Sequence, residues 1–271
     1  MNANETNLPI TASAAGPLRA RAERSCENAE RLAAALLETL LNAVDATDPQ
    51  TGAHVRRVAR YALILAAAAD LDEHAQHDVE RVALFHDIGK IHEALFDIVH
   101  DPRKLTAADR RAILTHPQRG VDVLAPLEAF YPTLSDGVLG HHERWDGTGY
   151  PSGHAGDAIP LNARIVAIAD SFDAITFSRR YQTGVSEIDA LDLIAIGRGA
   201  QFDPDLTDLF LFPPVVEEII AAMHECNDQA PSGTADRRRG AEEPVPDVTF
   251  RWRSEARKPR GRVGGVRTPH E

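Results

Sequence analysis

The segment ALFHDIGK, residues 83–90, places a histidine and an aspartate directly after an apolar run. His86 and Asp87 are adjacent there, and Lys90 follows four residues after His86. Burying charged groups in an apolar stretch is unfavourable unless opposite charges compensate them. A divalent cation supplies such compensation, because imidazole and carboxylate groups are among its natural ligands. The segment therefore indicates metal chemistry.

A second segment, HHERWDGTGYP at 141–151, begins with two adjacent histidines, His141 and His142. We expect them to end a helix, because the glycines that follow allow a tight departure of the chain. Pro151 then fixes the exit of the loop. Tyr150 either faces the site or packs on the loop. The segment predicts two further metal ligands at the junction of a helix and a loop.

Three more residues share this pattern of a metal-binding side chain beside an apolar stretch. They are His54 in TGAHVRRVARYA, His116 in ILTHPQRG and Asp170 in ARIVAIADSFDAIT. The candidate ligands are therefore five histidines and two aspartates: His54, His86, Asp87, His116, His141, His142 and Asp170. This number exceeds the needs of one metal, and with a bridging carboxylate it suits two divalent ions about 3.5–4 Å apart. Nitrogen and oxygen ligands without thiolates favour iron or manganese over structural zinc.

The elements that must position these residues all have helical periodicity. We find no alternating pattern typical of a strand, so the sequence predicts an all-α fold, a multi-helix bundle with the metal site in its core. In LTAADRRAI, Thr106 is expected to cap a helix, with Asp109 at the third helical position. The expected helices are 26–46, 51–69, 73–89, a helix beginning at 106, 117–124, 133–142, 161–178, 186–196 and 205–226.

The two ends of the chain differ in composition from this helical part. Residues 1–25 have no periodicity and are expected to be flexible, whereas 26–46 predict an amphipathic helix. That helix either packs on the main body or pairs with a second copy to form a homodimer. The main domain is expected over 47–226. Residues 227–271 are rich in Arg, Pro and Gly and are expected to be a disordered tail, which either contacts an anionic partner or only aids solubility.

The overall composition excludes several classes of function. A net charge of −12 argues against a general binder of large nucleic acids, which carry a basic field. The two cysteines, Cys26 and Cys226, are too far apart in sequence to suggest a CxxC metal or redox motif. The first residues lack a signal-peptide pattern, and the longest apolar run, 62–69, is shorter than the ~20 residues that span a bilayer. We expect a cytoplasmic protein without a membrane segment.

The combination of HDIGK with HHERWDGTGYP resembles the HD-GYP family, a subgroup of the HD superfamily of phosphohydrolases. The resemblance extends from about Asp48 to Phe212 and includes Asp170, the ARI of 163–165 and the QFDP of 201–204. It implies hydrolysis of cyclic di-GMP by a hydroxide that bridges two metals, with either pGpG or GMP as the final product.

The same resemblance implies a role for each site residue. Asp87 bridges two metals, one held with His54, His86 and Asp170, the other with His116, His141 and His142. Lys90, with Asp87, belongs to the catalytic set and contacts the substrate phosphate. Tyr150, Arg179 and Asp48 are the other implied substrate-binding residues.

The sequence departs from the family pattern at a few positions. Gln50 stands where some members have a glutamate associated with a third metal, and an amide is a poor ligand for a hard cation, so we expect two metals. His92 and Glu93 replace a short turn containing glycine and proline, and Arg180 stands where proline is usual. These differences leave the substrate open.

Three functions are therefore compatible with the sequence. The first is a phosphodiesterase for cyclic di-GMP. The second keeps the metals but acts on another cyclic dinucleotide, such as cyclic GMP-AMP, or on another nucleotide. The third is a signalling adaptor that binds a diguanylate-cyclase partner without turnover, although binding alone would not require all seven metal ligands.

Overall fold

The computed structural model describes residues 15–91, 106–177 and 185–228. These residues form α-helices and short 3₁₀ helices and no strand, apart from one isolated bridge between Arg198 and Phe202, so the predicted all-α class is confirmed. The elements, in chain order, are α1 (Ala15–Thr47), α2 (Pro49–Ala68), α3 (Glu73–Phe85), η1 (Ile88–Ile91), α5 (Ala107–Ile113), α6 (His116–Leu124), η2 (Ala125–Leu127), α7 (Leu134–Gly140), η3 (Gly156–Ala158), α8 (Leu161–Phe177), α9 (Glu187–Ile196), α10 (Pro204–Phe210) and α11 (Pro213–Asp228).

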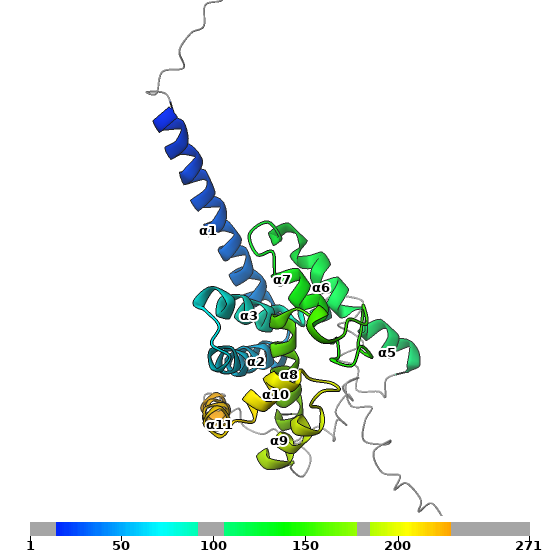
Figure 1. Ribbon diagram of the computed structural model, residues 1–271. Coiled ribbons are helices and arrows are strands. Elements are labelled where there is room, and N and C mark those ends of the chain that lie inside the picture. Colours follow the sequence, from blue (N-terminus) through cyan, green and yellow to red (C-terminus); the bar gives the residue numbers. More distant parts are fainter. Residues whose placement is uncertain (1–14, 92–105, 178–184, 229–271) are drawn as a thin grey trace, which may run out of the picture.

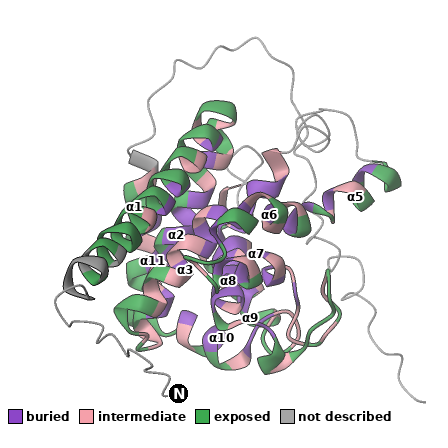
Figure 2. Ribbon diagram, turned by 90° about the horizontal axis from the view of Figure 1, so that it is seen from above, coloured by how far each residue is buried: buried purple, intermediate pink, exposed green. Residues whose placement is uncertain are grey.

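Helix α8 forms the centre of the bundle and packs against α2, α3, α7 and α9 (Figure 1). It is apolar on most of its surface, which is the pattern of a buried helix. Ile165, Ile168 and Phe172 are fully buried, and the Phe172 ring contacts the rings of Tyr61 and Phe210 edge-on. Figure 2 shows the buried positions gathered where α2, α3, α7 and α8 meet. A carboxylate on α8, such as that of Asp170, therefore lies in the core.

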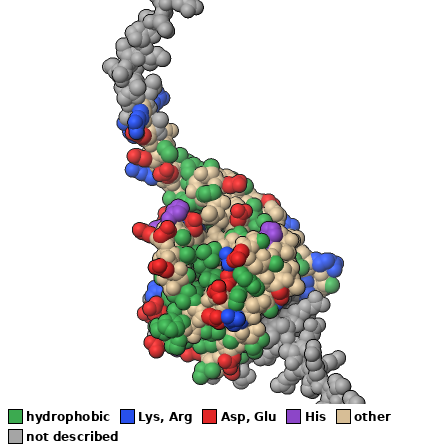
Figure 3. Space-filling view, viewed as in Figure 1, with side chains coloured by type: hydrophobic (Ala, Val, Ile, Leu, Met, Phe, Trp, Pro, Cys, Tyr) green, Lys and Arg blue, Asp and Glu red, His purple; other side chains and the backbone are tan. Residues whose placement is uncertain are grey.

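Helix α1 has two parts with different surroundings. Its later part packs on α2 through Ala33, Leu37 and Val44, which are buried. Its earlier part projects from the body and carries charged side chains of both signs (Figure 3). Leu32 and Leu36 are exposed. Packing on the body is thus the observed arrangement of the later part, and pairing with a second copy stays a prediction.

The largest differences from the expected helices are at three places. Helix α1 begins at Ala15 rather than at residue 26, because the Ala, Arg and Glu residues before Cys26 are good helix formers. Helix α3 ends at Phe85 instead of continuing to Gly89. The single helix expected over 205–226 is divided into α10 and α11, because Pro213 and its neighbouring proline have no N–H with which to continue a helix.

Two helix starts follow familiar capping patterns. Thr106 and Asp109 form the predicted capping box at the start of α5: the Thr106 side chain accepts from the Asp109 N–H and the Asp109 carboxylate accepts from the Thr106 N–H. Asp48 caps α2, where its Oδ1 accepts from the backbone N–H groups of Gln50 and Thr51 at 3.0 and 3.2 Å. None of the helices in the described part of the chain is long and apolar enough to cross a membrane.

Asp203 connects α10 to α8 and provides a test of this packing. Its Oδ1 accepts from the N–H groups of Asp205 and Leu206, and its Oδ2 accepts from Arg164 at 2.7 Å. Because Asp203→Ala removes a helix cap and a partly buried ion pair together, we expect the free energy of unfolding to fall by about 2 kcal/mol. Urea denaturation followed by circular dichroism measures this. Asp208→Ala, which removes only the exposed pair with Arg198, is the control and should change stability little. Equal stability losses in the two variants would contradict the assignment.

Candidate metal centre

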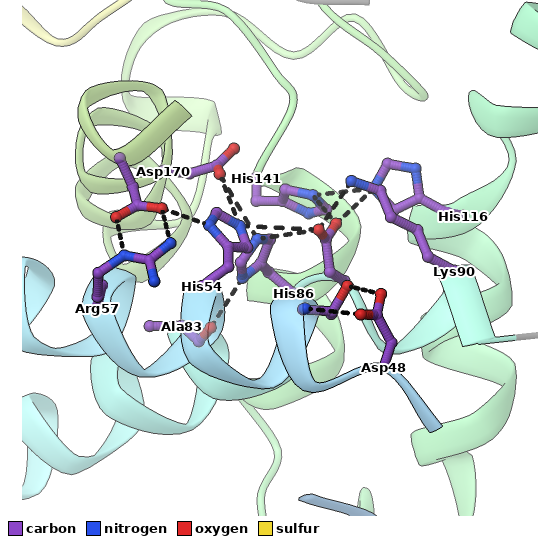
Figure 4. Close-up of polar contacts among 12 residues, drawn as sticks. Asp48, His54, Arg57, Ala83, His86, Lys90, His116, His141 and Asp170 are labelled. Carbon is purple, nitrogen blue, oxygen red and sulfur yellow. Dashed lines mark hydrogen bonds and ion pairs between the residues drawn. The ribbon is translucent and has the colours of Figure 1, made fainter. Parts of the chain in front are cut away.

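The structure brings all seven predicted ligands together in the core. Figure 4 labels His54, His86, His116, His141 and Asp170 among them. They form two groups, and within each group the candidate ligand atoms lie within 4.8 Å of one another. One group is Asp87, His116, His141 and His142; the other is His54, His86 and Asp170. The residues come from α2, the turn between α3 and η1, the start of α6, the end of α7 and the middle of α8. The family resemblance implied a similar grouping, except that it assigned Asp87 to both metals, and the roles of these residues as ligands stay predictions.

Asp87 lies between the two groups, with one carboxylate oxygen toward each. Its Oδ1 is 3.3 Å from Nε2 of His116 and 4.0 Å from Nε2 of His141. Its Oδ2 is 3.6 Å from Nε2 of His86 and 3.9 Å from Nε2 of His54. A carboxylate in this position is able to bridge two cations.

Three of the histidines are oriented by the backbone. The Nδ1 atoms of His86, His116 and His141 lie 2.8, 2.8 and 2.6 Å from the carbonyl oxygen of the residue three positions earlier. A carbonyl oxygen only accepts, so in each ring Nδ1–H is the donor. In the neutral ring Nε2 then carries the lone pair, and this atom faces the centre of the site.

The closest contact between these rings shows why a cation fits. Nε2 of His116 is 3.1 Å from Nε2 of His141. Burial and the charge of Lys90 lower the pKa of His116 to about 4, and burial and His86 hold the pKa of His141 well below its usual value. Two neutral rings would therefore direct lone pairs at each other. Nε2 of His86 and Oδ1 of Asp87 are also buried without a hydrogen-bond partner within the described residues. A divalent cation among these atoms would satisfy all of them.

In the other group, His54 contacts two carboxylates, those of Asp170 and Asp173. Nε2 of His54 is 3.3 Å from Oδ1 of Asp170. Burial opposes ionisation of Asp170, but its hydrogen bond with His54 and the charge of His86 lower its pKa to about 2. Burial likewise lowers the pKa of His54, but hydrogen bonds with Asp170 and Asp173 outweigh it and raise that pKa to about 10. The carboxylates thus draw positive charge into this group, which a metal ion would supply.

The loop after α7 folds back over His142. The ring of Tyr150 stacks on the ring of His142, with 4.9 Å between the ring centroids, and the Tyr150 N–H donates to the His142 carbonyl. Burial and the neighbouring His141 hold the pKa of His142 well below its usual value. The buried carboxylate of Glu143 accepts from the backbone N–H groups of Ser152 and Gly153 at 2.6 and 3.0 Å and so closes the loop. Sequence reasoning missed Glu143, although a glutamate after two candidate ligands was a usable signal.

The residues expected to contact substrate differ in how close they lie to the candidate centre. Lys90 donates from Nζ to Oδ2 of Asp87 at 2.8 Å, so it lies at the edge of the centre. Asp48 lies at the start of α2, where its carboxylate is engaged by the helix cap. Arg179 lies outside the described residues. Substrate contacts by Lys90, Tyr150, Asp48 and Arg179 stay predictions.

Two further residues near the centre were not predicted. Asp173 lies one turn after Asp170 on α8, and Arg57 lies one turn after His54 on α2; both are buried. A second carboxylate in the apolar helix of Asp170 was the available signal for Asp173. Arg57 carried no local signal, because an arginine in an amphipathic helix is most simply expected at the surface.

Fold and site together define an all-helical protein with a buried, two-part centre of histidines and aspartates. The chain matches the HD domain family over residues 38–206, and it belongs to that family. The HD-GYP type indicated by its motifs is confirmed by its relatives. The family match begins within α1 and ends within α10, and it contains every described residue of the centre.

Several characterised proteins are similar to this chain. The "3'3'-cGAMP-specific phosphodiesterase 2" of Vibrio cholerae serotype O1 is 36% identical over 178 residues, which are 65% of this chain and 34% of that protein. The "Cyclic di-GMP phosphodiesterase response regulator RpfG" of Xanthomonas campestris pv. campestris is 37% identical over 177 residues, 65% of this chain and 46% of that protein. The matches therefore span between a third and a half of the length of these relatives.

A solved structure shares the fold. It is described as an HD-GYP protein, Bd1817, from Bdellovibrio bacteriovorus, and it superposes with a TM-score of 0.50 at 18% identity, covering 74% of this chain and 64% of that chain. At this identity the likeness concerns the arrangement of helices.

Proposed function

We propose that this protein is a metal-dependent phosphodiesterase that hydrolyses cyclic di-GMP to pGpG and onward to GMP. The observation that carries the proposal is the position of Asp87, whose two oxygens face separate groups of nitrogen and oxygen ligands. Such a carboxylate suits a pair of cations, and paired cations are typical of enzymes that displace groups at phosphorus.

In this proposal His54, His86, Asp87 and Asp170 hold one metal, and Asp87, His116, His141 and His142 hold the other. The donor set of imidazoles and carboxylates without thiolates suits iron or manganese. When bound, such metals lower the pKa of coordinated water and polarise a phosphoryl oxygen.

The other residues of the site would act on the substrate. Lys90 presents an ammonium group at the edge of the centre, where it would stabilise negative charge on the phosphate. Tyr150, Arg179 and Asp48 are proposed to line the substrate site. In the reaction a water oxygen bonds to phosphorus, the bond from phosphorus to the 3′ oxygen breaks, and that oxygen takes up a proton. The product of the first cleavage is the linear dinucleotide.

Cyclic GMP-AMP is the second candidate substrate. It is favoured by the 36% identity to a relative named as specific for 3'3'-cGAMP, which is close to the 37% identity to the relative named for cyclic di-GMP. Both candidates share the cleavage of a 3′–5′ phosphodiester and differ in one base. We further propose that the protein is cytoplasmic and interacts with a signalling protein. We do not expect it to bind large nucleic acids.

Metal analysis and a substrate panel test the proposal together. The chain is purified without oxygen, its metal content is measured, and it is incubated with iron or manganese and each cyclic dinucleotide. We expect two metals per chain and release of pGpG from cyclic di-GMP. Consumption of cyclic GMP-AMP alone would establish the second candidate. Intact substrates under every metal and redox condition would refute catalysis and favour the adaptor.

A further inference from the structure

We propose that Asp173 and Arg57 are positioning residues for His54, an inference that rests on the proposed metal centre. Oδ2 of Asp173 lies 2.7 Å from Nδ1 of His54. Arg57 holds the same carboxylate with two hydrogen bonds, from Nε to Oδ1 at 2.7 Å and from Nη2 to Oδ2 at 2.9 Å. The carboxylate thus accepts Nδ1–H of His54 and leaves Nε2 facing Asp170.

The place of His54 in its helix explains why it needs this device. His86 and His141 follow the last turns of α3 and α7, and His116 follows the end of α5. Carbonyl groups in a last helical turn have no partner inside the helix, so they are free to accept from a histidine ring. His54 lies inside α2, where the preceding carbonyls accept from helical N–H groups. Its ring therefore requires a side-chain acceptor from another helix.

Two successive side-chain contacts of this kind join α2 to α8. His54 meets Asp170 in one layer, and Arg57 meets Asp173 one turn further along both helices. The guanidinium group of Arg57 also lies over the ring of Phe177, 3.9 Å from its centroid. A paired guanidinium with two hydrogen bonds has one orientation, so the carboxylate it holds is fixed as well. Burial of the Arg57–Asp173 pair makes this orientation rigid.

The contact of Asp173 with His54 should affect only one of the two proposed metal sites. Asp173 contacts a member of the group His54, His86 and Asp170, whereas the histidines of the other group that are held through Nδ1 use backbone carbonyls. Loss of a partner that orients a metal ligand typically weakens metal binding about 10–100-fold. Removing the Asp173 carboxylate should therefore weaken one metal site and spare the other.

Manganese binding to the full chain tests this. Wild type, Asp173→Asn, Arg57→Lys and a control are titrated with Mn²⁺ alone by equilibrium dialysis, and electron paramagnetic resonance distinguishes a coupled ion pair from an isolated ion. The control is Glu225→Gln, which breaks the exposed pair of Arg60 with Glu225, also between α2 and another helix. We expect two ions for wild type and control, and one tight ion with an isolated signal for Asp173→Asn, its second site weakened about 10–100-fold.

Arg57→Lys keeps the charge but loses the double hydrogen bond, so we expect a smaller weakening of the same site. Arg57→Lys also tests the positioning role if Asp173→Asn does not fold, which circular dichroism would reveal. Two tight ions in both variants, or equal weakening of both sites, would overturn the positioning role while leaving the metal centre intact. No bound manganese in wild type would overturn the proposed metal centre and this inference with it.

Discussion

Replacing Asp87 by alanine is expected to lower the rate of the proposed phosphodiesterase reaction by about 10³-fold or more, because it removes a charge that faces both halves of the candidate centre. The two oxygens of Asp87 face His116 on one side and His86 on the other. Its pKa is held well below the usual value although burial opposes this, because Lys90 and the surrounding histidines favour the charged form. Without this carboxylate each group loses a negative ligand, so both metals should bind weakly.

The measurement for Asp87→Ala combines metal content with the rate of cyclic dinucleotide hydrolysis. Asp87→Asn keeps the shape of the side chain and removes its charge, so a similar loss in this variant assigns the effect to the carboxylate. Asp78→Ala is the control, because Asp78 lies on α3, the helix that precedes Asp87, and pairs with Arg81 away from the centre. An Asp87→Ala protein that retains two metals and wild-type turnover would refute the assignment.

The seven residues that meet in the candidate centre could be predicted from the sequence, because each one departs from the local pattern. A histidine directly after an apolar run, such as His86, or an aspartate inside an apolar helix, such as Asp170, needs a reason to be buried, and a shared cation is such a reason. The all-α class was equally accessible, since helical periodicity is a local property. The residues alone did not show which predicted ligands group together on each side of Asp87. This grouping depends on how five separate segments pack against one another.

The residues that were missed act through tertiary contacts. Arg57 is indistinguishable in sequence from the surface arginines beside it, and only the packing of α2 on α8 pairs it with Asp173. Glu143 follows two candidate ligands in the sequence, but its contact with the Ser152 N–H forms only when the loop folds back. The end of α3 at Phe85 was missed for the same reason, because η1 is shaped by its contact with α6.

That contact is the basis of the second large effect, expected for Gly89→Ala. A Cβ atom on Gly89 would lie 2.1 Å from the carbonyl oxygen of His116 and 2.7 Å from the backbone nitrogen of Gly120. Both are backbone atoms, so no side chain can rotate away, and η1 has to separate from α6. We expect the free energy of unfolding to fall by about 1–3 kcal/mol, the usual range for overpacking. Because Asp87 precedes η1 and His116 begins α6, the same displacement should weaken the metal site they share.

Urea denaturation and manganese binding test both parts of this prediction. Gly140→Ala is the matched control: it also precedes a ligand, His141, but its Cβ would lie 3.3 Å from the Cβ of Ala163 and 3.4 Å from Cδ of Pro160, which are side-chain atoms. Its stability should stay within about 1 kcal/mol of wild type, since alanine favours a helix and offsets the mild crowding. A Gly89→Ala protein with unchanged stability and two tight metals would mean that η1 and α6 need not touch. The close approach of these two segments would then not be what brings Asp87 to His116.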